Sequence, residues 1–202
     1  MKLSPDQLDA LTEVVNIGVG RAAATLCELV DDHIALRVPN VRVCDPSLLG
    51  DPTSLTGEAL DTSVVQDFSV TMRGRALLAF PQSSGVTLAQ LLGQQDEGCD
   101  DLDFDLAGVL EEVGNIVLNA VLGSLANLFE GELDYTVPQL RAEEAAEGII
   151  ADYHTGSDEQ TVLMADAHFD VANSAISGSL LLAFSMNEMA ALLDKLVLAS
   201  ET

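Results

Sequence analysis

Two pairs of polar side chains have the types and the spacing to do chemistry. In each pair a glutamate is followed three residues later by an asparagine: Glu13 with Asn16, and Glu112 with Asn115. A carboxylate can bind a cationic side chain. A neutral amide can hold a water molecule through its carbonyl oxygen while its NH2 group donates hydrogen bonds. Each pair therefore combines an anionic group with a neutral amide that can both donate and accept hydrogen bonds.

Each pair is followed by a proline at the same distance. Asn16 and Pro39 are separated by 22 residues, as are Asn115 and Pro138, and both prolines follow a valine. A single Glu-x-x-Asn is most simply a pair of solvated helix residues. The same constellation repeated at an offset of 99 residues indicates an internal duplication in which both copies kept their polar groups. The two prolines are interpreted as structural residues that shape a strand edge near the helix.

A second likeness supports the duplication. Residues 74–80 read GRALLAF and residues 178–184 read GSLLLAF, at an offset of 104. The second half should therefore contain about five extra residues, and the segment 142–153 is predicted to hold them. Because a unit of about 100 residues is small for a core of its own, one pseudo-twofold domain is expected. This domain is expected to cover residues 1–202, with one repeat at about 1–97 and the other at about 101–202.

The elements that must position these groups follow from hydrophobic periodicity. It predicts an α+β fold with a mainly antiparallel sheet and two long helices related by a pseudo-twofold axis. Ser4 and Pro5 are expected to start the first helix, and Gly74 is expected to be a turn between strands. The predicted helices cover about 5–29, 86–92, 105–129, 142–153 and 186–198. The predicted strands cover 33–44, 64–73, 75–80, the surroundings of 137–138, 161–171 and 176–184, and the linker is 94–103.

The polar groups are expected on an exposed face of the long helices. Asp9, Glu13 and Asn16 lie at i, i+4 and i+7, which places them on one helix face. At about 100° per residue, that face is rotated roughly 130° from the apolar stripe. The second pair shares a face in the same way, with Asn119 one turn further on. Asparagine has a poor helix propensity, so its occurrence at both equivalent positions favours a functional role.

The charge of the chain limits its partners. The 202 residues include 33 acidic and 8 basic side chains, which gives a net charge of −25. Such a surface repels phosphate backbones and anionic lipids, which argues against nucleic-acid binding and membrane insertion. The acidity could serve a basic partner. Its spread along the whole chain instead favours adaptation to a halophilic cytoplasm, where salt screens self-repulsion.

Other features indicate a cytoplasmic protein. The N-terminal residues include Asp and Glu where a signal peptide would need an apolar segment. The three cysteines are an odd number without a CxxC motif, which favours reduced thiols. The three histidines show no ligand spacing, so no metal site is expected. No run of about 20 uninterrupted apolar residues is present, so no membrane-spanning helix is expected.

The repeated pattern resembles that of the CheC group of chemotaxis proteins, relatives of CheX and FliY. The pattern of that group is Asp/Ser-x3-Glu-x2-Asn-x22-Pro. Asp9, Glu13, Asn16 and Pro39 match it at every position. In the second copy Gly108 replaces the leading Asp or Ser, and the rest matches. The resemblance covers essentially the whole chain.

The resemblance implies a function, partners and roles for these residues. The implied reaction is dephosphorylation of the phosphorylated response regulator CheY, and the receptor deamidase CheD is a second implied partner. Glu13 and Glu112 are expected to pair with a lysine of the regulator, and Asn16 and Asn115 to position the attacking water. No cofactor of the chain's own is expected, because the phosphorylated regulator holds the Mg²⁺ ion.

Two alternatives remain open. The chain could be an adaptor that binds CheD or the flagellar switch with little hydrolysis, or an unrelated acidic dimerising domain whose polar stripe is a symmetric interface. The two copies are not expected to be equal. Gly108 breaks the second motif, whereas Val15, where the group often has glycine, only crowds the first. Asn16 is therefore expected to belong to the slightly stronger site.

Overall fold

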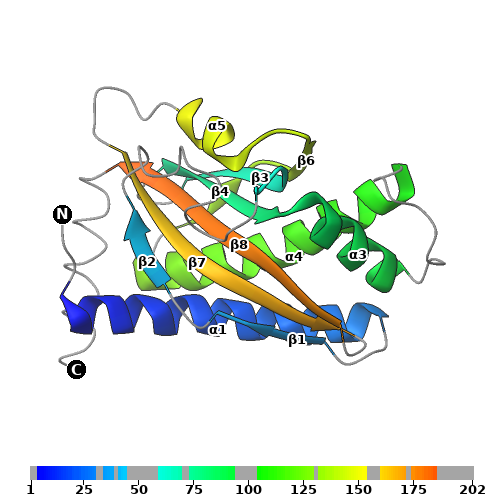
Figure 1. Ribbon diagram of the computed structural model, residues 1–202. Coiled ribbons are helices and arrows are strands. Elements are labelled where there is room, and N and C mark those ends of the chain that lie inside the picture. The colour runs from blue at the N-terminus through cyan, green and yellow to red at the C-terminus, as the bar shows by residue number, and fades with distance from the viewer. Residues whose placement is uncertain are drawn as a thin grey trace.

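The computed structural model describes residues 4–30, 34–38, 41–44, 59–69, 73–93, 104–129, 132–153, 160–171 and 174–185. The elements are α1 (Pro5–Val30), β1 (Ile34–Arg37), β2 (Val41–Cys44), β3 (Thr62–Ser69), β4 (Arg73–Phe80), α3 (Gln82–Gly93), α4 (Phe104–Phe129), β5 (Asp134–Tyr135), β6 (Gln139–Ala142), α5 (Ala146–Ala151), β7 (Gln160–Val171) and β8 (Ser174–Ser185). The long helices α1 and α4 pack on one face of the sheet, and the short α5 covers the other (Figure 1). The predicted α+β class is confirmed.

The described strands form one antiparallel sheet. Their order is β1-β7-β8-β4-β3-β5, with β2 also paired to β7 and β6 to β3. The two Leu-Leu-Ala-Phe strands, β4 and β8, are neighbours at the centre, where Leu77 lies opposite Leu181. These two residues differ by the same offset of 104 that relates the two strands in the sequence, so the central pairing is symmetric about them. This register supports the proposal of an internal duplication.

Each outer part of the sheet is supplied by the opposite half of the chain. β1 and β2, from the first half, pair with β7 of the second half. β5 and β6, from the second half, pair with β3 of the first half. The two halves are therefore interleaved, which supports the proposal of one domain over two separable ones.

The first helix begins with a capping box. Ser4 Oγ accepts a hydrogen bond from the Gln7 backbone N–H at 3.2 Å, and Gln7 Oε1 accepts one from the Ser4 N–H at 2.9 Å. This reciprocal pair satisfies donors that a helix start leaves free, and Pro5 suits the first helical position. The apolar side chains that follow at helical spacing are all buried: Leu11, Val15, Val19, Ala22 and Leu26.

The two long helices come into close backbone contact at Gly18. A Cβ there would lie 2.6 Å from the Val121 Cα, so the missing side chain lets the two backbones come together. The segment Leu106–Asn127 of α4 is apolar and long enough to span a membrane by length and composition alone. In this fold its apolar stripe forms part of the protein core instead. Its buried residues include Leu110, Val113, Val117 and Val121.

The prediction that Gly74 is a turn is wrong. Gly74 lies inside β4, opposite Phe68 on β3. A Cβ at this position would collide with the Phe68 ring, so glycine serves a close approach within the sheet. Ser69 pairs with Arg73, which places the connection at 70–72, outside the described residues.

The five extra residues of the second half are not in the segment 142–153. Leu78 pairs with Val64 in the first hairpin, and Leu182 pairs with Leu163 in the second. Leu182 is 104 residues beyond Leu78, whereas Leu163 is only 99 beyond Val64, so the extra length lies in the β7–β8 hairpin. The extra helix predicted for the segment is present as α5.

The single strand predicted at 33–44 is instead two short strands, β1 and β2, which both pair with β7. The helix predicted at 186–198, the linker at 94–103 and Pro39 lie outside the described residues.

Candidate functional site

The first motif lies on an open face of α1. The side chains of Asp9, Glu13 and Asn16 are exposed, as their helical spacing predicted. Ile17, next to Asn16, is 46 % exposed, so an apolar side chain accompanies the polar ones. Among the described residues, none forms a hydrogen bond with the Asn16 side chain. The proline of this motif, Pro39, is outside the described residues.

The second motif lines a groove. The groove has a volume of about 410 Å³ and runs between α4 and the segment that connects β5 to β6. Its lining residues are Gly108, Glu111, Glu112, Asn115, Tyr135, Thr136, Val137 and Pro138. The structure therefore brings together the glutamate, the asparagine and the proline of the second motif, which are far apart in the sequence. Asn115 is half-buried here and not fully exposed as the helical pattern predicted.

Two glycines in the first half of α4 shape this groove. One leaves space in it, and the other lets the helix lie close to the sheet. Gly108, which replaces the polar residue of the motif, is exposed, and a Cβ there would meet no atom within 4 Å. Gly114 faces the opposite way, and a Cβ there would collide with Val64 on β3. The helix can therefore lie against the sheet next to Asn115 because residue 114 has no side chain.

The far wall of the groove is fixed to β3. The Thr136 backbone N–H donates to the Asp67 carbonyl oxygen at 2.9 Å, and the Asp67 N–H donates to Thr136 Oγ1 at 3.0 Å. The wall is also tied to α4, because Glu111 Oε1 accepts a hydrogen bond from the Leu140 backbone N–H at 3.0 Å. Two apolar side chains stand at the rim, with Val137 81 % exposed and Tyr135 52 % exposed.

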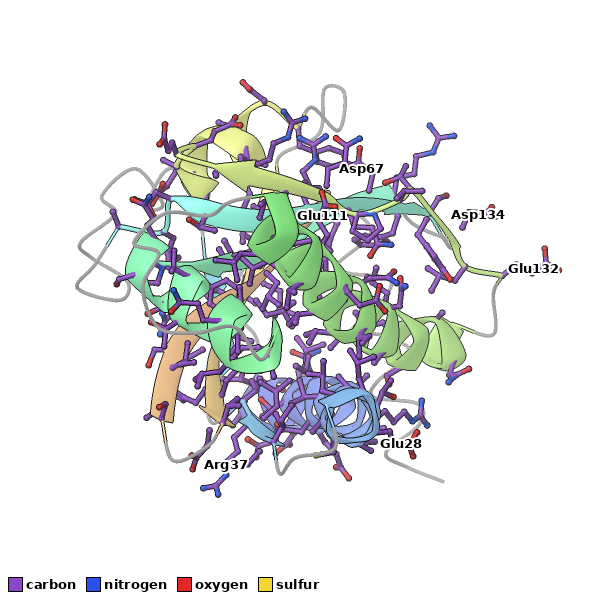
Figure 2. The ribbon with its side chains drawn as sticks, turned by 90° about the vertical axis from the view of Figure 1, so that its right-hand side faces the viewer. Glu28, Arg37, Asp67, Glu111, Glu132 and Asp134 are labelled. Atoms are coloured by element: carbon purple, nitrogen blue, oxygen red, sulfur yellow. The ribbon has the colours of Figure 1, made fainter. Side chains whose placement is uncertain are left out.

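The charge around the groove is negative. Glu111 and Glu112 line it, and Glu132 and Asp134 are exposed where the chain enters β5. Figure 2 shows Glu111, Glu132 and Asp134 on the side formed by α4 and the β5–β6 segment, whereas Glu28 and Arg37 lie at the α1 side. Such a rim favours a cationic partner group. Within the described ranges, no group of three or more His, Cys, Asp and Glu side chains could hold a metal ion.

A nearby cation, Arg75 on β4, is already paired. Its Nε lies 2.7 Å from Asp67 Oδ1 and its Nη2 lies 3.1 Å from Asp67 Oδ2. The bond with Asp67 raises the pKa of Arg75 above its ordinary value. Arg75 also donates to the Ile149 carbonyl oxygen at 3.1 Å, so it ties α5 to β3 and β4. Its role is therefore to hold the scaffold behind the groove wall.

Behind Asn115 lies a chain of side-chain amides. Asn119 Nδ2 donates to Asn115 Oδ1 at 2.6 Å, and Gln66 Nε2 donates to Asn119 Oδ1 at 3.0 Å. Gln66 Nε2 also donates to the Thr136 carbonyl oxygen at 2.9 Å. Gln66 is on β3 and is only 1 % exposed. The amide of Asn115 is thus connected to the sheet and to the groove wall.

The sequence pattern missed Gln66, Thr136 and Glu111. The spacing predicts that Asn119 lies on the motif face, but it does not predict the hydrogen bond to Asn115. A signal for Gln66 exists, since it is a polar residue at an inward position of a strand, between the apolar inward residues Val64 and Phe68. A polar group in a core strand usually has a buried hydrogen-bond partner.

Known proteins resemble this chain both in sequence and in fold. No protein-family model matches it. The CheY-P phosphatase CheC of Bacillus subtilis is 30 % identical over 146 residues, which cover 68 % of this chain and 67 % of that protein. The flagellar motor switch phosphatase FliY of the same organism is 26 % identical over 148 residues, 72 % of this chain but only 38 % of FliY.

A solved structure extends the likeness to nearly the full chain. The crystal structure of FliY from Thermotoga maritima superposes with a TM-score of 0.70 and covers 98 % of both chains, at 18 % identity. That match concerns the fold alone. The identity to CheC over two thirds of both chains, together with the duplicated Glu–Asn motif, shows that this chain belongs to the CheC family.

Proposed function

We propose that this protein hydrolyses the aspartyl phosphate of a CheY-type response regulator. The main observation in support is the groove on α4, which is lined by Glu112, Asn115 and Pro138, the three residues of the second motif. The sequence relatives support the choice of substrate, because CheC is named as a CheY-P phosphatase and FliY as a motor switch phosphatase. These names support CheY-P phosphatase activity as the role of the family. The roles of individual residues in that reaction are part of our proposal.

In the proposed reaction, water replaces the aspartyl group on phosphorus. The water oxygen forms a bond to phosphorus while the bond between phosphorus and the aspartyl oxygen breaks, and inorganic phosphate and a free carboxylate result. Phosphoryl transfer through a loose transition state needs positioning and electrostatic stabilisation more than a strong base. An asparagine amide can supply both, by accepting a hydrogen bond from the water and donating one to a phosphoryl oxygen.

The glutamates are proposed to dock the regulator. Glu13 and Glu112 are both exposed, one turn before the asparagine on the same helix face. Each could pair with a lysine of the regulator, which would set the register of the helix on the phosphorylated site. The Mg²⁺ ion is expected to belong to the regulator, so this chain would contribute no cofactor. The proposed place of action is the cytoplasm.

An adaptor function is the second candidate. It is favoured by the FliY relative, whose name places it at the flagellar motor switch. In this case the exposed acidic groups would bind a switch protein or the deamidase CheD, and hydrolysis would be weak. Binding of CheD follows only from the family resemblance and stays a prediction.

Release of inorganic phosphate from acyl-phosphorylated CheY separates the two candidates. The double variant Asn16→Ala/Asn115→Ala should reduce the rate to that of the regulator's own autohydrolysis. Loss of the Asn115–Asn119 hydrogen bond should cost only about 1 kcal/mol of stability, so the variant should stay folded. The matched control is Asn127→Ala, an exposed asparagine further along α4, which should keep the parental rate. A folded double variant with the parental rate would exclude the proposed mechanism.

A further inference from the structure

The direction of the hydrogen bonds behind Asn115 is fixed by one backbone group. The Thr136 carbonyl oxygen can only accept, so the Gln66 atom at 2.9 Å from it must be the nitrogen Nε2. This nitrogen also lies 3.0 Å from the Asn119 side chain, and because an amide nitrogen only donates, the Asn119 atom must be Oδ1. The remaining polar atom of the Asn119 amide is then Nδ2, which must donate to Asn115 Oδ1 at 2.6 Å.

This chain of donors and acceptors leaves one outcome for Asn115. Its oxygen accepts the hydrogen bond from Asn119, so its NH2 group is available to donate to a ligand in the groove. One lone pair of the oxygen also remains free to accept a hydrogen bond. A side-chain amide without such partners can rotate by 180° and exchange its oxygen and nitrogen. Here a reversed Asn115 would place its nitrogen against the nitrogen of Asn119, which is unfavourable.

We infer that Asn119 and Gln66 are positioning residues, which hold the Asn115 amide so that its NH2 group donates to a phosphoryl oxygen of the substrate. This inference rests on the proposed phosphatase function. Neither residue touches the substrate, because Gln66 is buried on β3 and Asn119 lies one helical turn behind Asn115. Their effect is to pre-orient the amide before the substrate binds.

The burial of Gln66 supports a role beyond packing. Its Oε1 is buried without a hydrogen-bond partner among the described residues, which disfavours an amide at this position for stability alone. The position at the offset of 99 residues in the other half is Ala165 on β7, which is apolar. An apolar side chain is therefore compatible with this part of the sheet.

Among the residues that the structure describes, the first half has no equivalent of this network. At the same offset, the residue that corresponds to Asn119 is Gly20, which is exposed and has no side chain. Asn16 therefore lacks both partners. The inferred device belongs to the site on α4 only.

The first test uses kinetics in a protein whose α1 site is disabled by Asn16→Ala. Adding Asn119→Ala should lower kcat for phosphorylated CheY by about three- to tenfold, the equivalent of one ordinary hydrogen bond, and leave KM nearly unchanged because Glu112 still docks. Asn119→Asp should have a similar effect, since a carboxylate can accept from Gln66 but cannot donate to Asn115. Asn127→Ala is again the matched control. A parental kcat in both Asn119 variants, with normal melting, would overturn the positioning role.

The second test needs no substrate. Exchange of the side-chain amide protons with solvent, followed by nitrogen-resolved NMR, should show the strongest protection for Gln66, less for Asn119 and the least for Asn115. Protection of the Asn115 protons above those of Asn119 would mean that the amide chain runs the other way and would overturn the inference. If Asn16→Ala alone removes all hydrolysis, the proposed function of the α4 site fails, while the exchange order still decides the orientation of Asn115.

Discussion

The two copies of the Glu–Asn motif lie in different surroundings. On α1, Glu13 and Asn16 stand on an exposed helix face, and Asn16 has no hydrogen-bond partner among the described residues. On α4, Glu112 and Asn115 line a groove whose far wall is bonded to β3, and Asn115 is held by Asn119. Among the described residues, the same short pattern therefore lies on an exposed helix face in one half and lines a groove in the other.

This difference separates the two roles that we propose for the motif, which are docking and positioning. Docking through a carboxylate needs only an exposed charge, and both copies offer one. Positioning through an amide benefits from a fixed orientation, because less has to be ordered when the substrate binds. Within the described part of the chain, only the α4 copy has an asparagine whose amide orientation is fixed by a hydrogen bond.

The largest expected effect comes from separating the halves. Residues 1–97 contain β1 and β2 but lack β7, the strand with which both pair. The fragment also lacks α4, against which α1 packs at Gly18. It should therefore be unfolded or aggregated, as circular dichroism and thermal melting would show.

The complementary fragment provides the control for this experiment. Mixing 1–97 with 98–202 should restore a cooperative transition, because each supplies the strands that the other needs. If 1–97 alone melts cooperatively at the temperature of the parent, the proposal of a single interleaved domain is wrong.

A smaller effect should separate the two sites. The Asn16→Ala variant keeps the walled site, and Asn115→Ala keeps the open one, so the first should hydrolyse phosphorylated CheY about three- to tenfold faster than the second. The motif alone favoured Asn16, because Gly108 breaks the second copy. The groove and the amide chain now give a physical reason to expect the reverse order. Equal rates, or a faster Asn115→Ala variant, would show that a fixed amide gives no advantage.

The smallest effect should come from the rim of the groove. Val137 is 81 % exposed, so Val137→Ser should change stability by no more than about 0.5 kcal/mol, the usual range for surface sites. If the regulator packs on this rim, KM should rise by a few-fold with kcat unchanged. The lost contact would stabilise the bound substrate and the transition state equally. Leu29→Ser is the matched control, because Leu29 is 58 % exposed but lies near the end of α1. An unchanged KM would place the regulator away from the rim.

Local patterns predicted most of the elements, because they depend on near neighbours in the chain. The capping box at Ser4 and the buried stripe of α1 follow from side chains within a few turns of one another. Gly74 was misassigned because glycine is common both in turns and where a bulky group approaches closely, and the Phe68 ring is visible only once β3 and β4 are paired. The position of the extra five residues likewise became clear only from the register of the β7–β8 hairpin.

The sequence by itself determined that Glu13 and Asn16 share one helix face, that Glu112 and Asn115 share another, and that both copies belong to one duplicated pattern. These conclusions need only the helical repeat and the spacing of residues along the chain. The tertiary structure alone decided how the second asparagine is held. Gln66 comes from β3, Asn119 from α4 and Thr136 from the connection between β5 and β6. They meet because α4 packs against β3 and because β5 and β6 pair with the same strand. Hydrogen bonds act over about 3 Å, so contacts of this kind depend on packing between distant segments, which no local sequence pattern specifies.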